Sequence, residues 1–207
     1  MKLIDFFESD ASDEAKEKNL VYKGFGRWSD DSGKIIAKTV DGKLQYLDAP
    51  ENDETSMEHA AHEFALAAHG DQKYGNEPYD NHLEEVVGLA KRFGGDETEI
   101  TAARLHDVIE DTAVTKEQLA AQFGSEVAEI VDLLSNLGKD YNSKKATFER
   151  IRTNPKAVFV KLCDRIANTS RGKKNDKYRK EQPLFKQILY RPGEYDLMWA
   201  VLDKILG

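Results

Sequence analysis

The chain has 207 residues, of which 40% are hydrophobic and 33% are charged, and its formal net charge is −8. This length allows one sizeable core plus an accessory segment, and the apolar runs are too short to span a membrane. The negative charge argues against nucleic acid as the main partner, because binding to phosphate backbones needs an excess of Lys and Arg. We therefore expect a soluble protein with neither a membrane nor a nucleic-acid partner.

The cysteine content and the N-terminus indicate the compartment. A single cysteine, Cys163, excludes an internal disulfide bond, which agrees with a reducing environment. Acidic residues interrupt the first apolar stretch and no small-residue cleavage site follows, so a signal peptide is not supported. These features predict a cytoplasmic protein.

Residues 1–53 are expected to form a small β-rich N-terminal extension. In the segments 20–28, 34–40 and 43–47, β-branched and aromatic residues alternate with polar ones, and turn residues separate the segments. We predict a three-stranded antiparallel meander. A polar linker with Pro50 follows, and the sequence then changes to helical spacing, so we place the domain boundary there.

Residues 54–207 predict a helical domain, because apolar residues recur at intervals of three and four. The predicted helices cover about residues 55–69, 82–93, 97–110, 115–122, 125–136, 143–152, 155–169, 176–190 and 194–206. A loop with Pro78 and Tyr79 joins the first two. The fold class is therefore mainly α, a helical bundle with a small N-terminal antiparallel β meander.

The most informative motif is Leu-His-Asp-Val-Ile-Glu-Asp-Thr at residues 105–112. On a helix, residues four apart lie on neighbouring parts of one surface. This spacing joins His106 to Glu110 and Asp107 to Asp111. Because the surrounding residues are typical of a helix core, the group is not explained as an exposed acidic helix end.

Two further polar residues in helix-core context, His82 and Asp164, extend this group to two imidazoles and two carboxylates. A mixed nitrogen and oxygen set suits Mn²⁺, Fe²⁺, Co²⁺ or Zn²⁺ better than Ca²⁺ or Mg²⁺. Thiolate-rich structural zinc is excluded by the cysteine count. Four protein ligands would leave positions for water and a phosphate oxygen, as catalysis on phosphate requires.

Three segments, residues 68–82, 105–112 and 160–168, together resemble the HD superfamily of metal-dependent phosphohydrolases. Their longer strings resemble the hydrolase domain of the RelA/SpoT alarmone family and its single-domain small alarmone hydrolases. The resemblance covers about residues 55–207. It implies an enzyme of the stringent response that hydrolyses the 3′-pyrophosphate of (p)ppGpp or of (p)ppApp-type alarmones, and no synthetase domain is expected.

The resemblance also implies roles for individual residues. The metal, usually manganese in this family, would be held by His82, His106, Asp107 and Asp164. Glu110 and Asp111 match the acidic pair that orients and activates the attacking water. The purine nucleotide would contact Lys73, Tyr74, Asn168, Tyr178 and Arg179.

The chain departs from the family pattern at two places. Lys73 and Tyr74 stand where the family usually has an Arg-Lys type pair that contacts the purine and its phosphates, and we expect Tyr74 to stack on the base. Arg104 stands where the family tends to have a leucine, and we expect it at the helix surface.

Two alternative functions stay open. One is another HD nucleotide phosphohydrolase, such as an NADPH 2′-phosphatase or a nucleoside monophosphatase, which the departure at Lys73 and Tyr74 favours. The other is a nucleotide-sensing binding module in which residues 1–53 recruit a partner. Glu110 and Asp111 argue against the sensor, because binding alone needs no water-activating pair. Self-association as a homo-oligomer also stays open.

Overall fold

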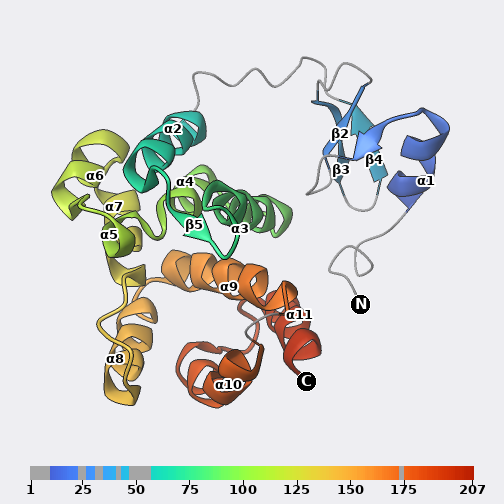
Figure 1. Cartoon of the computed structure of the whole chain (residues 1–207). Coiled ribbons are helices and arrows are strands. Elements are labelled where there is room, and N and C mark those ends of the chain that lie inside the picture. Colours follow the sequence, from blue (N-terminus) through green and yellow to red (C-terminus); the bar gives the residue numbers. More distant parts are fainter. Residues whose placement is uncertain (1–9, 23–26, 31–34, 41–42, 47–56, 173–174) are drawn as a thin grey trace. The chain divides into compact units, whose positions relative to one another are not determined.

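The structure is a computed structural model, and it describes residues 10–22, 27–30, 35–40, 43–46, 57–172 and 175–207. The chain divides into two compact units, Met1–Glu54 and Thr55–Gly207 (Figure 1). The expected boundary at residues 53 and 54 falls within the stretch 47–56, which lies outside the described residues. In the described part of the chain, no helix is both long enough and apolar enough to cross a membrane.

The N-terminal unit contains a short helix, α1 (Asp10–Glu17), and one antiparallel sheet. The sheet has four strands in chain order: β1 (Val21–Tyr22), β2 (Arg27–Ser29), β3 (Ile35–Val40) and β4 (Lys43–Tyr46). The predicted meander is confirmed, but the segment predicted as one strand over residues 20–28 contains both β1 and β2, which pair with each other.

A small apolar core joins α1 to the sheet. Ala15, Trp28 and Ala37 are buried, and Leu20 and Leu44 pack against them. The indole N–H of Trp28 also donates a hydrogen bond to the Thr39 hydroxyl at 2.9 Å. Because a sheet this small is marginal alone, the packed helix is needed for its stability. The sequence pattern did not predict α1.

The second unit is mainly helical. Its helices are α2 (Met57–His69), α3 (Asp80–Arg92), α4 (Glu97–Leu105), α5 (Val108–Asp111), α6 (Lys116–Phe123), α7 (Ser125–Leu134), α8 (Tyr141–Ile151), α9 (Pro155–Ser170), α10 (Asn175–Leu189) and α11 (Asp196–Leu206). The expected loop between α2 and α3 forms a hairpin of two short strands, β5 (Lys73–Tyr74) and β6 (Glu77–Pro78). Gly75 has a φ of 67° in its turn, a conformation that glycine adopts easily.

Local capping sequences fix several helix starts. The Asp96 side chain caps α4 by accepting a hydrogen bond from the backbone N–H of Glu99, and the Glu99 side chain accepts one from the backbone N–H of Asp96. Thr115 and Gln118 form the same pair of hydrogen bonds at the start of α6. Asn154 caps α9, whose first residue is a proline. The predicted starts at residues 97, 115 and 155 therefore agree with the structure to within one residue.

The prediction of one helix over residues 97–110 is wrong, because this segment forms two helices. α4 ends at Leu105 and α5 begins at Val108, so His106 and Asp107 lie at the junction. The Nδ1 atom of His106 is hydrogen-bonded to the carbonyl oxygen of Ala103 at 2.9 Å. That oxygen belongs to the last turn of α4, where carbonyl groups lack backbone partners within the helix. After the junction, α5 packs against α2 and α7.

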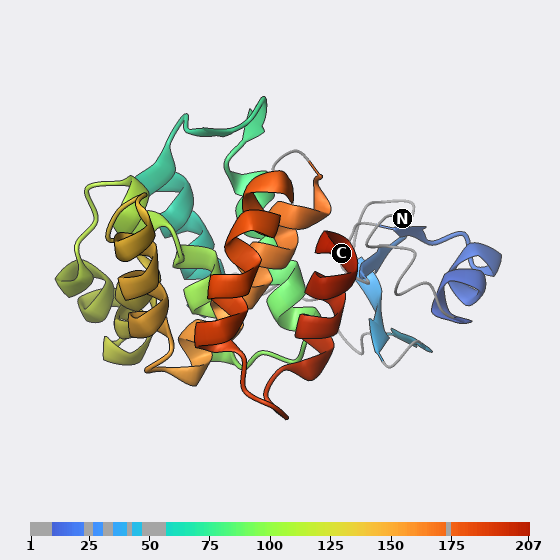
Figure 2. The same ribbon diagram turned by 90° about the horizontal axis from the view of Figure 1, so that it is seen from below.

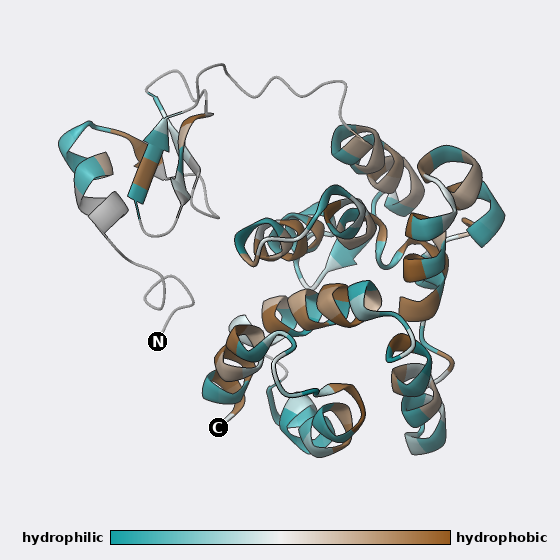
Figure 3. Cartoon of the chain, turned by 180° about the vertical axis from the view of Figure 1, so that it is seen from behind, coloured by the Kyte–Doolittle hydropathy of each residue, from teal (hydrophilic) through white to brown (hydrophobic). Residues whose placement is uncertain are grey.

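α9 is the central helix of the second unit. It contacts α3 and α4 on one side, and α8, α10 and α11 form a row on the opposite side (Figure 2). Hydrophobic residues recur along α9 (Figure 3), and Val160, Leu162, Cys163 and Ile166 are fully buried. The helix that carries Asp164 is therefore held rigidly by packing on both sides.

The prediction that Arg104 lies at the helix surface is wrong, because its side chain is buried. It is only 1% exposed, and its Nη2 atom lies 2.7 Å from Glu58 of α2 and 2.8 Å from Glu84 of α3. Burial alone would raise the pKa of Glu58. The hydrogen bond from Arg104 and the charges of Lys91 and Arg104 outweigh burial and lower this pKa to about 2. Arg104 thus joins three helices electrostatically.

We expect Arg104→Leu to lower the free energy of unfolding by about 1–3 kcal/mol at neutral pH, because Glu58 and Glu84 lose their shared cation. The lowered pKa of Glu58 stabilises the folded protein at pH values above 4.5, which is the ordinary pKa of this group. This contribution is lost as the pH falls toward about 2. Urea denaturation should therefore show that the difference in free energy of unfolding between the native protein and the variant becomes smaller as the pH falls.

The matched control is Lys91→Met, which removes the more exposed cation beside Glu58 and should cost less than about 1 kcal/mol. An Arg104→Leu variant as stable as the native protein at neutral pH would contradict the electrostatic role of Arg104.

Candidate metal centre and nucleotide pocket

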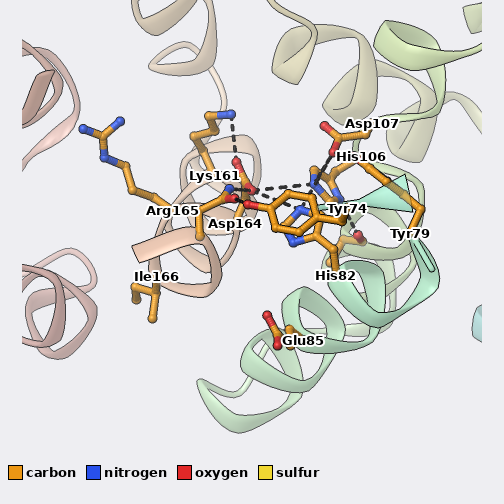
Figure 4. Close-up of polar contacts among 12 residues, drawn as sticks. Tyr74, Tyr79, His82, Glu85, His106, Asp107, Lys161, Asp164, Arg165 and Ile166 are labelled. Atoms are coloured by element: carbon orange, nitrogen blue, oxygen red, sulfur yellow. Dashed lines mark hydrogen bonds and ion pairs between the residues drawn. The ribbon is translucent and has the colours of Figure 1, made fainter. Parts of the chain in front are cut away.

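Four side chains from three parts of the second unit meet at one point (Figure 4): His82 from α3, His106 and Asp107 from the α4–α5 junction, and Asp164 from α9. The Nε2 atom of His82 lies 3.5 Å from Asp164 and 3.9 Å from Asp107. The Nε2 atom of His106 lies 3.0 Å from Asp107 and 3.8 Å from Asp164. The structure thus brings all four predicted metal-ligating residues together.

The electrostatics of this cluster favour a positive charge at its centre. Because the Ala103 carbonyl can only accept a hydrogen bond, Nδ1 of His106 carries a proton, and Nε2 is the ring atom that faces the carboxylates and could bind a metal ion. Burial alone would lower the pKa of His106, but the charges of Asp107 and Asp164 raise it to about 9. Burial alone would raise the pKa of Asp107, and the neighbouring His106 outweighs this and lowers it.

The donor atoms of this cluster fit a divalent cation. The ligand atoms of His82, His106 and Asp107 all lie within 4.8 Å of one another, and Asp164 contacts both imidazoles. Among the described residues, His62, Asp80 and Glu84 form a second group that meets the same spacing. The Arg104 guanidinium already lies against that second group, so a built-in cation balances its carboxylates.

Neighbouring polar residues hold the two carboxylates of the cluster in place. Lys161, one helical turn before Asp164, donates to its Oδ2 atom at 3.0 Å, and Asn168 donates to Oδ1. Burial would raise the pKa of Asp164, but the charge of Lys161 and contacts with the two histidines lower it well below its ordinary value. The Tyr79 hydroxyl donates to Asp107. The role of Tyr79 was not predicted, because residues 79 and 107 belong to different elements.

The acidic pair Glu110 and Asp111 lies on α5 beside the cluster, and an amide side chain holds each acid. The Glu110 carboxylate accepts hydrogen bonds from the backbone N–H and the side-chain amide of Asn136 at 2.8–3.0 Å. The Asp111 carboxylate accepts one from the Gln72 amide at 2.8 Å. Neither amide was predicted, because no local pattern links them to α5.

The cluster opens into a pocket of about 240 Å³. Its lining includes both acids, the metal-site residues His82, Asp107 and Asp164, and side chains from α8, α9 and α10. Three predicted substrate-binding residues line it: Tyr74, Asn168 and Tyr178. Positive charge comes from lysines at positions 144, 161 and 177 and from Arg165, which binds Glu181 and the Tyr178 carbonyl oxygen.

Two predicted substrate-binding residues, Lys73 and Arg179, do not line this pocket. The Arg179 guanidinium instead donates to the carbonyl oxygen of Leu206 at 2.8 Å and to Asp176 at 3.0 Å. Consecutive residues on a helix point about 100° apart, so Tyr178 can face the pocket only if Arg179 turns away. Consecutive residues on a strand point to opposite faces, which separates Lys73 from Tyr74 in the same way.

The Tyr74 ring is already covered within the protein. It stacks on His82 with ring centroids 4.6 Å apart and an interplanar angle of 12°, and the Arg171 guanidinium lies 4.9 Å from its centroid. Its hydroxyl donates to Asn168, which in turn donates to Asp164. The base stacking expected from the sequence would therefore compete with the contacts that the ring already makes with His82 and Arg171. Tyr74 instead joins the β5–β6 hairpin to the metal-site residues.

Comparison with known proteins places this geometry in a family. The HD domain model matches residues 61–188, so the chain belongs to the HD domain family. Two curated relatives share about a third of the aligned residues. A probable guanosine-3′,5′-bis(diphosphate) 3′-pyrophosphohydrolase of Synechocystis is 33% identical over 73% of this chain, and the corresponding protein of Aquifex aeolicus is 32% identical over 70%. The chain spans 22% of the length of each relative.

Solved structures share the same fold. The structure of a metazoan ortholog of SpoT that hydrolyzes ppGpp matches with a TM-score of 0.63 and 22% identity, covering 77% of this chain and 96% of that one. The structure of lmo0812 from Listeria monocytogenes matches with a TM-score of 0.51 and 24% identity, covering 64% of this chain and 99% of that one. The helical unit therefore has the fold of these proteins.

Proposed function

We propose that the chain hydrolyses the 3′-pyrophosphate of (p)ppGpp or of a (p)ppApp-type nucleotide, in the cytoplasm and with a divalent metal ion. The observation that carries the proposal is the cluster of two imidazoles and two carboxylates beside a second pair of acids in one pocket. The activity for which the Synechocystis and Aquifex relatives are named supports the choice of substrate.

His82, His106, Asp107 and Asp164 would hold the metal, with Mn²⁺ as the expected ion and Fe²⁺, Co²⁺ or Zn²⁺ as other candidates for this donor set. When bound, such an ion supplies Lewis acidity toward a phosphate oxygen and lowers the pKa of water. Lys161 and Tyr79 orient Asp164 and Asp107 for this task through their hydrogen bonds.

Glu110 and Asp111 would orient the attacking water and accept its proton. Both carboxylates line the pocket, and neither is among the ligand atoms of the cluster. Because neighbouring acids share protons, we assign this role to the pair rather than to one member. Lys144 and Lys177 would face the phosphates, while Asn168 and Tyr178 would contact the nucleoside.

The purified protein should hydrolyse ppGpp in the presence of Mn²⁺, lose this activity in excess chelator and regain it when Mn²⁺ is restored. Pyrophosphate release should be measured for ppGpp, pppGpp and ppApp, and phosphate release for NADPH and nucleoside monophosphates. Preference for NADPH or a monophosphate would replace this proposal with a different HD phosphohydrolase. Full activity in chelator would contradict the metal-dependent mechanism.

The division between metal-site and water-activating carboxylates can be tested by substitution. Asp107→Ala should abolish Mn²⁺ binding measured by calorimetry, because it removes a proposed ligand. Glu110→Ala should leave Mn²⁺ bound but abolish turnover, because it removes only a group that handles the water. Equal loss of Mn²⁺ in both variants would refute this division.

We expect Tyr74 to act on substrate binding through its hydroxyl. Tyr74→Phe keeps the ring on His82 but removes the hydrogen bond to Asn168, so KM for ppGpp should rise about 2- to 12-fold, the effect of losing one neutral hydrogen bond. Tyr74→Ala should raise KM further. If Tyr74→Phe equals the native protein and only Tyr74→Ala is impaired, the hydroxyl has no part in substrate binding and the role of Tyr74 belongs to its ring.

A further inference from the structure

His69 and Gln72 connect the end of α2 to the acidic pair across a sequence separation of 39 residues. The Nδ1 atom of His69 lies 2.9 Å from the side-chain oxygen of Gln72, and the Gln72 amide nitrogen donates to Asp111 at 2.8 Å. We propose that His69 and Gln72 are positioning residues that hold the Asp111 carboxylate in its productive orientation. This inference rests on the proposed function of the acidic pair.

The donor and acceptor pattern gives this chain of hydrogen bonds one direction. An ionised carboxylate can only accept, so Gln72 must present its NH₂ group to Asp111 and its carbonyl oxygen to His69. His69 must then donate from Nδ1, so Nδ1 carries a proton. Each group is thereby fixed by the next, from His69 through Gln72 to Asp111.

His69 anchors this series of hydrogen bonds rigidly, because its side chain is packed as well as hydrogen-bonded. Its side chain is buried, and its ring stacks on Tyr79 with centroids 4.5 Å apart and an interplanar angle of 27°. The hydroxyl of the same Tyr79 donates a hydrogen bond to Asp107. His69 therefore supports both Asp107 of the proposed metal site and, through Gln72, Asp111.

The backbone around Gln72 is also fixed. Its N–H donates to the carbonyl oxygen of His69 at 3.1 Å, and its own carbonyl oxygen accepts from the Tyr79 N–H at 3.1 Å. By contrast, Asp111 ends the four-residue helix α5 and is solvent-exposed. Within the described part of the chain, the Gln72 amide donates a hydrogen bond to this carboxylate. Without Gln72, Asp111 would be free to change rotamer.

Kinetics of holoenzyme variants test the positioning role. Gln72→Leu removes the donor, Gln72→Glu keeps the shape but cannot donate as a carboxylate, and the exposed Gln122→Leu on α6 is the matched control. Both Gln72 variants should lower kcat for ppGpp about 10- to 100-fold, as expected for a misplaced catalytic group. KM and the calorimetric affinity for Mn²⁺ should stay within twofold of the native values.

A double-mutant cycle separates positioning from a general structural effect. In an Asp111→Ala background, Gln72→Leu should lower kcat by less than a further twofold, because its effect passes through Asp111. An undiminished effect in that background, or Gln72 variants with native kcat, would overturn the proposal.

An NMR measurement tests the hydrogen-bond chain without relying on turnover. Long-range ¹H–¹⁵N spectra of the five histidines should include a ring protonated at Nδ1 whose signals disappear in His69→Phe and which loses its fixed Nδ1–H in Gln72→Leu. An Nε2–H tautomer for native His69 would overturn the inference. If the native protein hydrolyses no nucleotide, the proposed function fails, and the NMR result alone decides whether His69 and Gln72 hold Asp111.

Discussion

Two carboxylates packed against two buried imidazoles form the interaction on which the second unit depends. Asp107 and Asp164 belong to different helical segments, and their like charges would repel in a buried site without a cation between them. His82 and His106 both direct Nε2 toward these two carboxylates. A bound divalent ion would therefore stabilise the packing of α3, the α4–α5 junction and α9, and it would link metal binding to folding.

The rest of the helical unit serves to keep this point fixed. α9 is packed on both sides, so Asp164 cannot retreat from the imidazoles, and the break after Leu105 turns Asp107 toward them. Arg104, two residues before His106, joins α4 to α2 and α3 through Glu58 and Glu84. The helix that leads into the proposed metal site is thus anchored by the buried charge of Arg104, and rigid elements are what a precise ligand geometry requires.

Much of this site could be predicted from the sequence, because its chemistry is carried by short motifs with helical spacing. His106 and Asp107 are adjacent, and Asp164 lies in a strongly apolar helix, so the donor set and the class of fold were accessible. Helical periodicity indicates which residues share one face of one helix, but not which faces of different helices meet. For that reason the burial of Arg104, the support from Tyr79 and the outward orientation of Arg179 needed the structure.

Pulsed EPR of the full chain loaded with Mn²⁺ tests the proposed metal site most directly, because nuclear modulation reports the nitrogen atoms bonded to the ion. Ligation by His82 and His106 should give modulation from two imidazole nitrogens in the native protein, and from one in His82→Gln under conditions where the ion stays bound. Mn²⁺ bound to the native protein without imidazole nitrogen modulation would show that these histidines are not its ligands.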